Sequence, residues 1–551
     1  MREAGLTDDP IQSARAAAGP AKLGEQVAAR LAAQIAANGW PAGHYLGHEE
    51  QLAKAFGVSR SAIREAIAIA EWDGYVESRR GREGGLYVCE QALEPAIAVL
   101  RNYLFLTGAG GGPPRQAPPR GGPAPRRPGR LGALSILGGA GRRRPPPPPP
   151  PPPRLVEGAI LERAIERIDR TQAAALEQIL AQPAAPQDDR LHLSRLKQIV
   201  DRMADLAGSP LLRVLAGSLR HCYVDRVRTT TLDDGAYLRA SRTVAELRLR
   251  QIEAILAYDR VAARDLQTRA MDVWARFQET VPTSDLSGAA IVNRLTATGD
   301  DALIYEFVRP AKKAEGVARA IAQMIASQHL GIGSRVGTEP DLIAALDVSR
   351  RVLREGIRIL ERFGIVESGR GKHGGLIVGQ PRPLALPGSF RGELAPSGDD
   401  ERTIAAMLLV HAVLAVTRDA AGEDGAAART LAERLRQEAR PEADMPAASA
   451  PAAQANAAFV TFLLDHLADP VARCLLGVAD DLQHNPPAAI PWPAFGTPTL
   501  LAVLEAIAAN DRFAAPRLVQ AALRADWAGT ERSRFTRPAP LPPVRLSDNG
   551  A

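Results

Sequence analysis

Aromatic residues and cysteines are scarce in this chain of 551 residues. Phe, Trp and Tyr together make up 4% of it, whereas apolar residues as a whole make up 46%. Sheets are enriched in aromatic and β-branched side chains, while the abundant alanine and leucine favour helices. The composition therefore predicts a mainly α protein, and the length predicts about four domains.

The three cysteines, Cys89, Cys222 and Cys474, lie far apart and form no CxxC pair. This argues against a zinc site and against a disulfide framework, and it favours a reducing compartment. No stretch approaches the ~20 apolar residues of a membrane span, and the first residues lack the apolar core of a signal peptide. We expect a cytoplasmic protein without membrane association, whose net charge of +6 permits a polyanionic partner.

The main positive feature is a repeat. The segment from Glu49 to Val88 aligns without a gap on the segment from Glu339 to Val378, at a constant offset of 290 residues. The similarity extends back to Pro20 and Pro310, so each copy also contains the segment before it. There, apolar residues recur at i, i+4 and i+8, which predicts an amphipathic helix in each copy; they are Val27, Leu31 and Ile35, and Val317, Ile321 and Ile325.

The residue pattern of each copy predicts a winged helix-turn-helix. A short helix over 49–56 is followed by a tight turn, and Ser59 stands where a helix N-cap is expected. In the helix that follows, Ile63 and Ala66 fall on the core face, and Arg60, Ser61 and Arg64 fall on the opposite face. Side chains then alternate with a period of two residues on both sides of the sequence GREGG, which predicts a β-hairpin.

An all-α domain follows each winged helix. The stretch from Glu253 matches the stretch from Glu505, so the helical domain is duplicated as well, although less faithfully. The predicted organisation is a flexible arm (1–19), winged helix 1 (20–92), helical domain 1 (93–283), a linker (284–309), winged helix 2 (310–382), a linker (383–399), helical domain 2 (400–535) and a tail (536–551).

A Gly, Pro and Arg segment at 108–154 interrupts the first helical domain and ends in nine prolines. This composition cannot form a packed core, and the proline run predicts an extended polyproline II segment. Two interpretations stay open, namely a disordered basic insert and a reading-frame slip in GC-rich DNA.

The helix after the sequence VSR carries the functional signal. In a helix-turn-helix its N-terminal end enters the major groove, where arginine can bond guanine O6 and N7 and the helix N-terminus can bond phosphate. Arg60 and Arg64 share a helix face, as do Arg350 and Arg354. The alternative is that these arginines lie on an exposed helix face and contact only solvent. Because the arginines recur at the same place in both copies, contact with DNA is favoured.

These motifs resemble the winged helix of GntR-type bacterial transcription regulators, and the helical domains resemble those of the FadR-like branch. By this resemblance, twelve residues occupy DNA-contacting positions: Ser59, Arg60, Ser61, Arg64, Arg80 and Gly81, and Ser349, Arg350, Arg351, Arg354, Arg370 and Gly371. The chain departs from the family at Glu50 and Pro340, where an arginine is common, so a phosphate contact is lost in each copy.

Many FadR-like domains bind a metal through one Asp and three His. The matching positions here are Leu196, Val200 and Arg248 in the first copy, and Asn456, Val460 and Leu500 in the second. Because neither set can build the site, no metal and no other cofactor is expected. Arg248 or Arg250 could bind a charged effector, although a surface arginine is the favoured interpretation.

The resemblance implies a homodimer that reads a palindrome, with half-sites about one helical turn apart. Two linked units therefore predict an intramolecular pseudodimer, with further oligomerisation left open. It would act on operator DNA as a repressor that an unknown small molecule, such as an organic acid, controls. The alternative is a ligand-binding or protein-interaction scaffold that has lost DNA binding. No motif indicates an enzyme.

Overall fold

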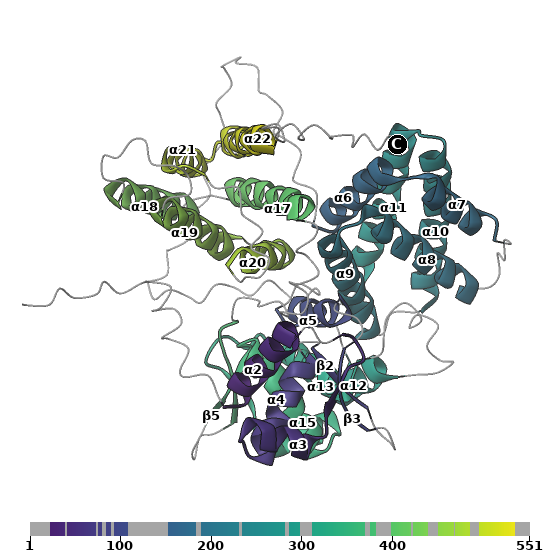
Figure 1. Ribbon diagram of the computed structural model, residues 1–551, viewed down its shortest axis with the longest axis vertical. Coiled ribbons are helices and arrows are strands. Elements are labelled where there is room, and N and C mark those ends of the chain that lie inside the picture. Colours follow the sequence, from purple (N-terminus) through teal and green to yellow (C-terminus); the bar gives the residue numbers. More distant parts are fainter. Residues whose placement is uncertain are drawn as a thin grey trace, which may run out of the picture. The chain divides into compact units, whose positions relative to one another are not determined.

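The computed structural model describes sixteen stretches of the chain and is mainly α (Figure 1). They are 23–38, 41–72, 75–79, 84–89, 93–107, 152–182, 189–230, 234–281, 286–297, 311–369, 375–381, 398–419, 423–438, 450–467, 469–484 and 495–534. This confirms the predicted fold class. Within these stretches, no helix is long and apolar enough to cross a membrane.

The first winged helix has three helices and three short strands. They are α2 (Leu23–Asn38), β1 (Tyr45–Gly47), α3 (Glu49–Phe56), α4 (Arg60–Trp72), β2 (Val76–Arg79) and β3 (Gly85–Val88). The strands are antiparallel in the order β1-β3-β2. Val27, Leu31, Ile63 and Ala66 form a buried core with Leu86, as the helical periodicity predicts.

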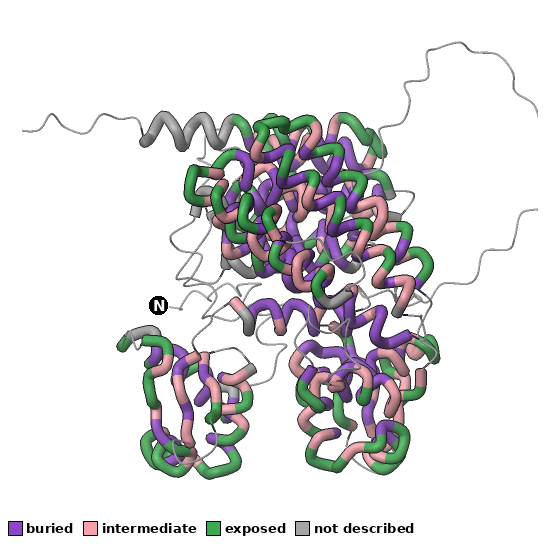
Figure 2. Tube along the Cα trace, turned by 90° about the vertical axis from the view of Figure 1, so that its right-hand side faces the viewer, coloured by how far each residue is buried: buried purple, intermediate pink, exposed green. Residues whose placement is uncertain are grey.

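The second winged helix repeats this plan. Its elements are α13 (Lys313–Ser327), β4 (Arg335–Gly337), α14 (Glu339–Leu346), α15 (Arg350–Arg362), β5 (Val366–Gly369) and β6 (Gly375–Val378). The sheet order β4-β6-β5 matches that of the first copy, and its hairpin register pairs Val366 with Val378. Buried and exposed stretches alternate along the trace of both winged helices, as amphipathic elements require (Figure 2).

Helices from both sides of the low-complexity segment build a bundle in the same compact unit as the winged helices. They are α5 (Leu93–Leu106), α6 (Pro152–Arg167), α7 (Arg170–Leu180), α8 (Asp189–Ala207), α9 (Pro210–Arg228), α10 (Asp234–Leu256) and α11 (Arg260–Thr280). Helix α5 packs on α9, and α10 packs on α11 and α8. Pro152 and Pro153 begin α6, and the rest of the proline run lies outside the described residues.

Two placements differ from the expected boundaries. The segment interpreted as a linker contains a helix, α12 (Gly288–Thr296), which packs on α13 of the second winged helix. Helix α20 (Pro470–His484), from the second helical domain in the sequence, groups with the first compact unit and packs on α5. Sequence order is therefore not the same as spatial grouping.

The second compact unit holds the remaining described helices. They are α17 (Gly398–Asp419), α18 (Glu423–Glu438), α19 (Ala450–His466), α21 (Thr497–Ala508) and α22 (Ala514–Arg534). Helix α21 packs on α18, α19 and α22. His466 Nδ1 lies 2.6 Å from Asp424 Oδ1, which ties the end of α19 to the start of α18.

Candidate nucleic-acid interface

The turn between the two helices of each motif uses a left-handed residue. It is Gly57 in the first copy, with φ 66°, and Asp347 in the second, with φ 51°. Glycine adopts this conformation without a steric cost, and aspartate is among the few other residues that tolerate it. The turn sends α4 and α15 away from the preceding helix, so that their N-terminal ends are exposed.

A serine caps each of these ends, as expected for Ser59. The Ser59 hydroxyl accepts a hydrogen bond from the backbone N–H of Ala62 at 3.2 Å. The Ser349 hydroxyl accepts one from the backbone N–H of Val352 at 3.4 Å. Each cap satisfies one of the four free N–H groups of the helix end, and the positive end of the helix dipole remains available to a phosphate.

The first-copy arginines are exposed and each faces its own carboxylate on α3. Arg60 Nη2 lies 2.5 Å from Glu50 Oε1, and Arg64 Nε lies 2.5 Å from Glu49 Oε1. The Arg60 and Arg64 side chains are 69% and 68% exposed. The position at which the family commonly has an arginine thus carries the carboxylate that compensates Arg60.

The second-copy arginines share one carboxylate. Arg350 Nε lies 3.2 Å and Arg354 Nε lies 2.9 Å from Glu339 Oε1. Pro340 supplies no charge, and a further arginine, Arg351, is 86% exposed and pairs with Glu355 along its own helix. The structure brings the predicted residues 59–64 together on one helix end, and likewise the predicted residues 349–354 on the other.

The wing tips lie outside the described residues, including the predicted contacts Arg80, Gly81, Arg370 and Gly371. At the base of each wing a glycine takes a positive φ, 141° at Gly85 and 150° at Gly375. A Cβ on Gly375 would lie 2.8 Å from the Gly337 carbonyl oxygen, so close strand pairing requires glycine there.

An aromatic cluster at the base of the first wing was not predicted from the sequence. The Arg79 guanidinium lies 4.4 Å from the centroid of the Tyr87 ring, which lies 5.2 Å from that of Tyr45. Arg79 also pairs with Glu77 at 2.6 Å. The second copy has Gly369 and Ile377 in place of Arg79 and Tyr87, and a comparison of the aligned copies at these positions could have found the difference.

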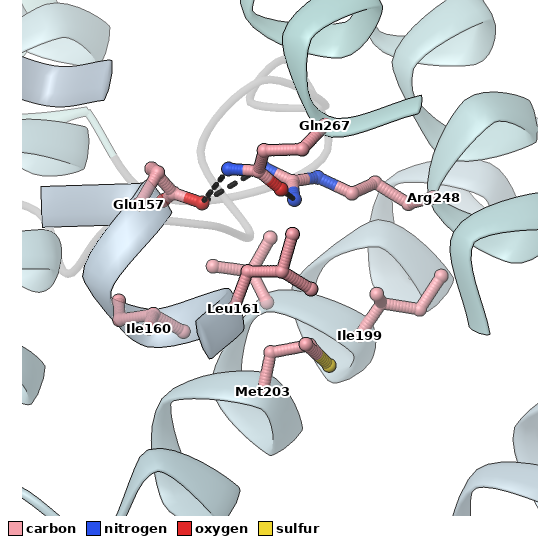
Figure 3. A pocket seen from close by; sticks show the side chains of 8 residues that line it. Glu157, Ile160, Leu161, Ile199, Met203, Arg248 and Gln267 are labelled. Carbon is pink, nitrogen blue, oxygen red and sulfur yellow. Dashed lines mark hydrogen bonds and ion pairs between the residues drawn. The ribbon is translucent and has the colours of Figure 1, made fainter. Parts of the chain in front are cut away.

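A small pocket in the first bundle adjoins a buried polar group (Figure 3). Its lining is largely apolar, with Ile160 and Met203 among the side chains, and Glu157, Arg248 and Gln267 line it as well. Arg248 is 5% exposed and its Nη2 donates to Glu157 Oε2 at 2.8 Å. The expectation that Arg248 is a surface arginine is therefore wrong, because helices α6 and α11 cover the face of α10 on which it lies.

The pocket is lined by Val200 and Arg248, which stand at two of the positions where the resemblance to FadR-like domains implied metal ligands. A valine has no donor atom, and a buried guanidinium carries a positive charge that would repel a cation. In the second unit the matching Asn456 bonds the backbone of Phe495 in both directions, at 2.8 and 3.1 Å. These residues do not fit a metal ion.

Comparison with known families agrees with this geometry. Residues 23–88 and 313–373 each match the family described as bacterial regulatory proteins, gntR family. The first matched segment spans winged helix 1, and the second covers winged helix 2 up to residue 373, just before β6. The chain therefore carries a tandem pair of gntR-type winged helix-turn-helix domains, which are DNA-binding domains of transcription regulators.

Individual relatives match over one such domain. The chain is 34% identical over 83 residues to a candidate HTH-type transcriptional regulator, RmpR, of Mycobacterium gastri, covering 15% of this chain and 30% of that protein. It is 42% identical over 69 residues to a candidate L-lactate dehydrogenase operon regulatory protein of Escherichia coli, covering 12% and 26%. The match spans less than a third of either relative. Both are named as regulatory proteins.

A Streptococcus agalactiae GntR structure aligns over 46% of this chain and 99% of its own length, with 18% identity and a TM-score of 0.25. A score of this size carries no weight for the fold.

Proposed function

We propose that this protein is a sequence-specific transcription regulator of the FadR-like branch, which binds operator DNA as a covalent pseudodimer and acts as a repressor in the cytoplasm. The supporting observation is that an exposed pair of arginines lies in the first two turns of the second helix in both copies, namely Arg60 with Arg64 and Arg350 with Arg354. This helix end is the part of a helix-turn-helix that reads base edges.

The ion pairs with Glu49, Glu50 and Glu339 do not oppose this role strongly. Solvent-exposed pairs are worth about 0.2 to 1 kcal/mol, whereas a bidentate arginine–guanine contact is worth about 1 to 3 kcal/mol. The arginines can therefore exchange a carboxylate for a base or a phosphate. Until then, the pairs hold the guanidinium groups near the helix end.

The pseudodimer would read an imperfect palindrome. The second position of the reading helix is Ser61 in one copy and Arg351 in the other, so each half-site meets a different set of donors. A covalent link makes binding of the second half-site effectively unimolecular. Selection of sites from random DNA by the full chain should return two unequal half-sites, and a strictly symmetric site would contradict this assignment.

We further propose that the pocket of the first bundle binds a small organic acid. The pocket as it stands has a volume of about 10 Å³, the space of one water molecule, so Glu157 would first have to move away from Arg248. The acid's carboxylate would then replace Glu157 as the partner of Arg248, and its carbon chain would contact the apolar lining. The Escherichia coli relative is named for the operon of an L-lactate dehydrogenase, which makes hydroxy acids the first set to test.

A thermal-shift screen of small organic acids tests this site. An acid that binds should raise the melting temperature of the wild type, and Arg248→Met should abolish that rise. Arg250→Met is the matched control, because Arg250 is exposed on the same helix. Equal shifts in all three proteins would place the acid elsewhere.

The competing function is a scaffold without DNA binding. It is favoured by the complete compensation of Arg60 and Arg64 by two carboxylates. A salt titration of binding to the upstream DNA of its own gene separates the two, because phosphate contacts give a steep dependence of the logarithm of the binding constant on that of the salt concentration. A scaffold would give no steep slope.

A further inference from the structure

A buried carboxylate joins three helices that are far apart in the sequence. Asp225, on α9, is fully buried. It accepts two hydrogen bonds from Arg101 of α5, from Nε and from Nη2, each at 2.5 Å. Arg319 Nη1, from α13 of the second winged helix, lies 2.8 Å from Asp225 Oδ2, the oxygen that also accepts from Arg101 Nε. We call Arg101, Asp225 and Arg319 the joint.

The joint contains charges that have been removed from water. The Arg101 and Arg319 side chains are 5% and 1% exposed. Burial lowers the pKa of Arg319 to about 10, although Asp225 opposes the shift. Burial would raise the pKa of Asp225, but Arg101 and Arg319 outweigh it and hold that pKa below its usual value. All three groups are therefore charged at neutral pH, and Arg101 and Arg319 depend on Asp225 for compensation, as does the buried Arg228, 3.9 Å from Asp225 Oδ1.

Helix α5 makes further contacts with the same arginine. Arg319 donates to the side-chain oxygen of Asn102 from Nη2 at 2.5 Å and from Nε at 3.2 Å. Its guanidinium also lies 5.6 Å from the centroid of the Phe105 ring. Arg319 is thus held by two helices of the bundle region, in a geometry that a shorter or apolar side chain could not reproduce.

The matching face of the first winged helix differs in sequence and in burial. Gln26, Ala29 and Arg30 of α2 are exposed, whereas their counterparts Gly316, Arg319 and Ala320 of α13 are buried. Gly316 lets α12 approach, since a Cβ there would lie 3.2 Å from Thr296 Cγ2. In α13 this face therefore has the small residues and the single arginine that packing against the bundle requires, and in α2 it does not.

We propose that the joint docks the second winged helix, and not the first, onto the bundle of the first repeat, so that the state of this bundle acts on the DNA half-site that Arg350 and Arg354 read. The regulatory part rests on the proposed function, whereas the docking part does not. Sensing would then cross between repeats, because a bundle formed after winged helix 1 in the sequence controls winged helix 2.

Hydrogen exchange of the full chain, followed by mass spectrometry, tests the docking without DNA. Arg319→Met replaces the arginine by an unbranched apolar side chain and removes the guanidinium charge of Arg319 from the joint. Amides of α13 should then exchange at least tenfold faster, while amides of α2 change by less than twofold. Unchanged exchange in α13, or an equal increase in both helices, would overturn the proposal.

Two further variants keep the test decisive if Arg319→Met folds poorly. Asn102→Asp places a second carboxylate beside Arg319 and should slow exchange in α13 several-fold; no slowing contradicts the proposal. Arg264→Met is the control, because Arg264 forms an exposed pair with Glu162 on the bundle surface, and it should leave both helices unchanged.

Footprinting on operator DNA tests the regulatory part. In Arg319→Met, protection of the half-site read by winged helix 2 should weaken at least fivefold more than protection of the other half-site. Equal weakening of both would overturn the cross-repeat control. If the wild type leaves no footprint at all, the proposed function fails, and the exchange result still decides the docking.

Discussion

The two winged helices have the same elements and sheet order but differ in how their arginines are compensated. In the first copy Arg60 and Arg64 each have a separate carboxylate, Glu50 and Glu49. In the second copy Arg350 and Arg354 share Glu339, and Pro340 adds no charge. Duplication has thus preserved the backbone plan while the electrostatics of the exposed helix end have diverged. The second copy nevertheless has two carboxylates in the first turn of α14, Glu339 and Asp341, so the two helix ends differ in how the arginines are paired and not in the number of acidic residues of that turn.

The largest expected effect comes from the buried cores. Ile63→Ala and Leu353→Ala should each lower the free energy of unfolding of their own winged helix by about 2 to 5 kcal/mol, because both side chains are fully buried and their loss leaves a cavity. Hydrogen exchange in urea measures the two domains separately. If Ile63→Ala destabilised α13 as much as α2, the two domains would not be independent cores.

Loss of a reading arginine should weaken one half-site only. Arg64→Ala is expected to cost about 1 to 3 kcal/mol of binding at the half-site of the first copy, and Arg354→Ala the same at the other. Titrations with DNA that carries one mutated half-site give the two values. Equal losses at both half-sites would exclude a separate reader for each.

Exchange of the turn residues tests the backbone difference. A Cβ on Gly57 would meet no atom within 4 Å, so Gly57→Asp carries only the cost of the left-handed conformation, about 1 kcal/mol. Asp347→Gly should stabilise the second copy by a similar or smaller amount. Thermal melts of the full chain report both. Destabilisation by both changes would show that Asp347 makes a contact that glycine cannot replace.

The smallest expected effect concerns the compensating carboxylate. Glu50→Gln should free Arg60 and strengthen binding at the first half-site by at most about 1 kcal/mol, since exposed ion pairs are weak. The slope of log binding constant against log salt concentration should steepen by about one, because one more phosphate contact forms. Gln51→Glu, on the same helix, is the control, because it changes the charge away from Arg60. If it weakened binding at the first half-site by as much as Glu50→Gln strengthened it, only the total charge would matter.

The sequence predicted what local patterns determine. The helix over 49–56 has its predicted bounds, Ser59 caps α4, and Ile63 and Ala66 are buried opposite Arg60 and Arg64. Each of these depends on residues a few positions apart and on two aligned copies. The exposed arginines of the candidate site were predictable for the same reason, because amphipathic periodicity identifies the face opposite the core.

The sequence did not predict the burial of Arg248 and Arg319, because a second set of helices packs on the polar face of each helix. Arg248 was expected on the surface, but α6 and α11 cover that face of α10 and supply Glu157 and Gln267. Arg319 likewise continues the polar face of its helix in the sequence, and only the packing of α5, α9 and α12 makes that face buried. Apolar periodicity in the sequence identifies one buried face of a helix. Whether a second face of the same helix is buried depends on contacts with segments that are distant in the sequence.

The acidic first turns of α3 and α14 have a kinetic consequence. Each winged helix brings two carboxylates of this first turn close to the DNA that its arginines would meet, Glu49 and Glu50 in the first copy and Glu339 and Asp341 in the second. Long-range attraction sets the rate of encounter more than the final affinity. We therefore expect the two winged helices to encounter DNA at similar rates, and the tether then delivers the one that is still free to its half-site.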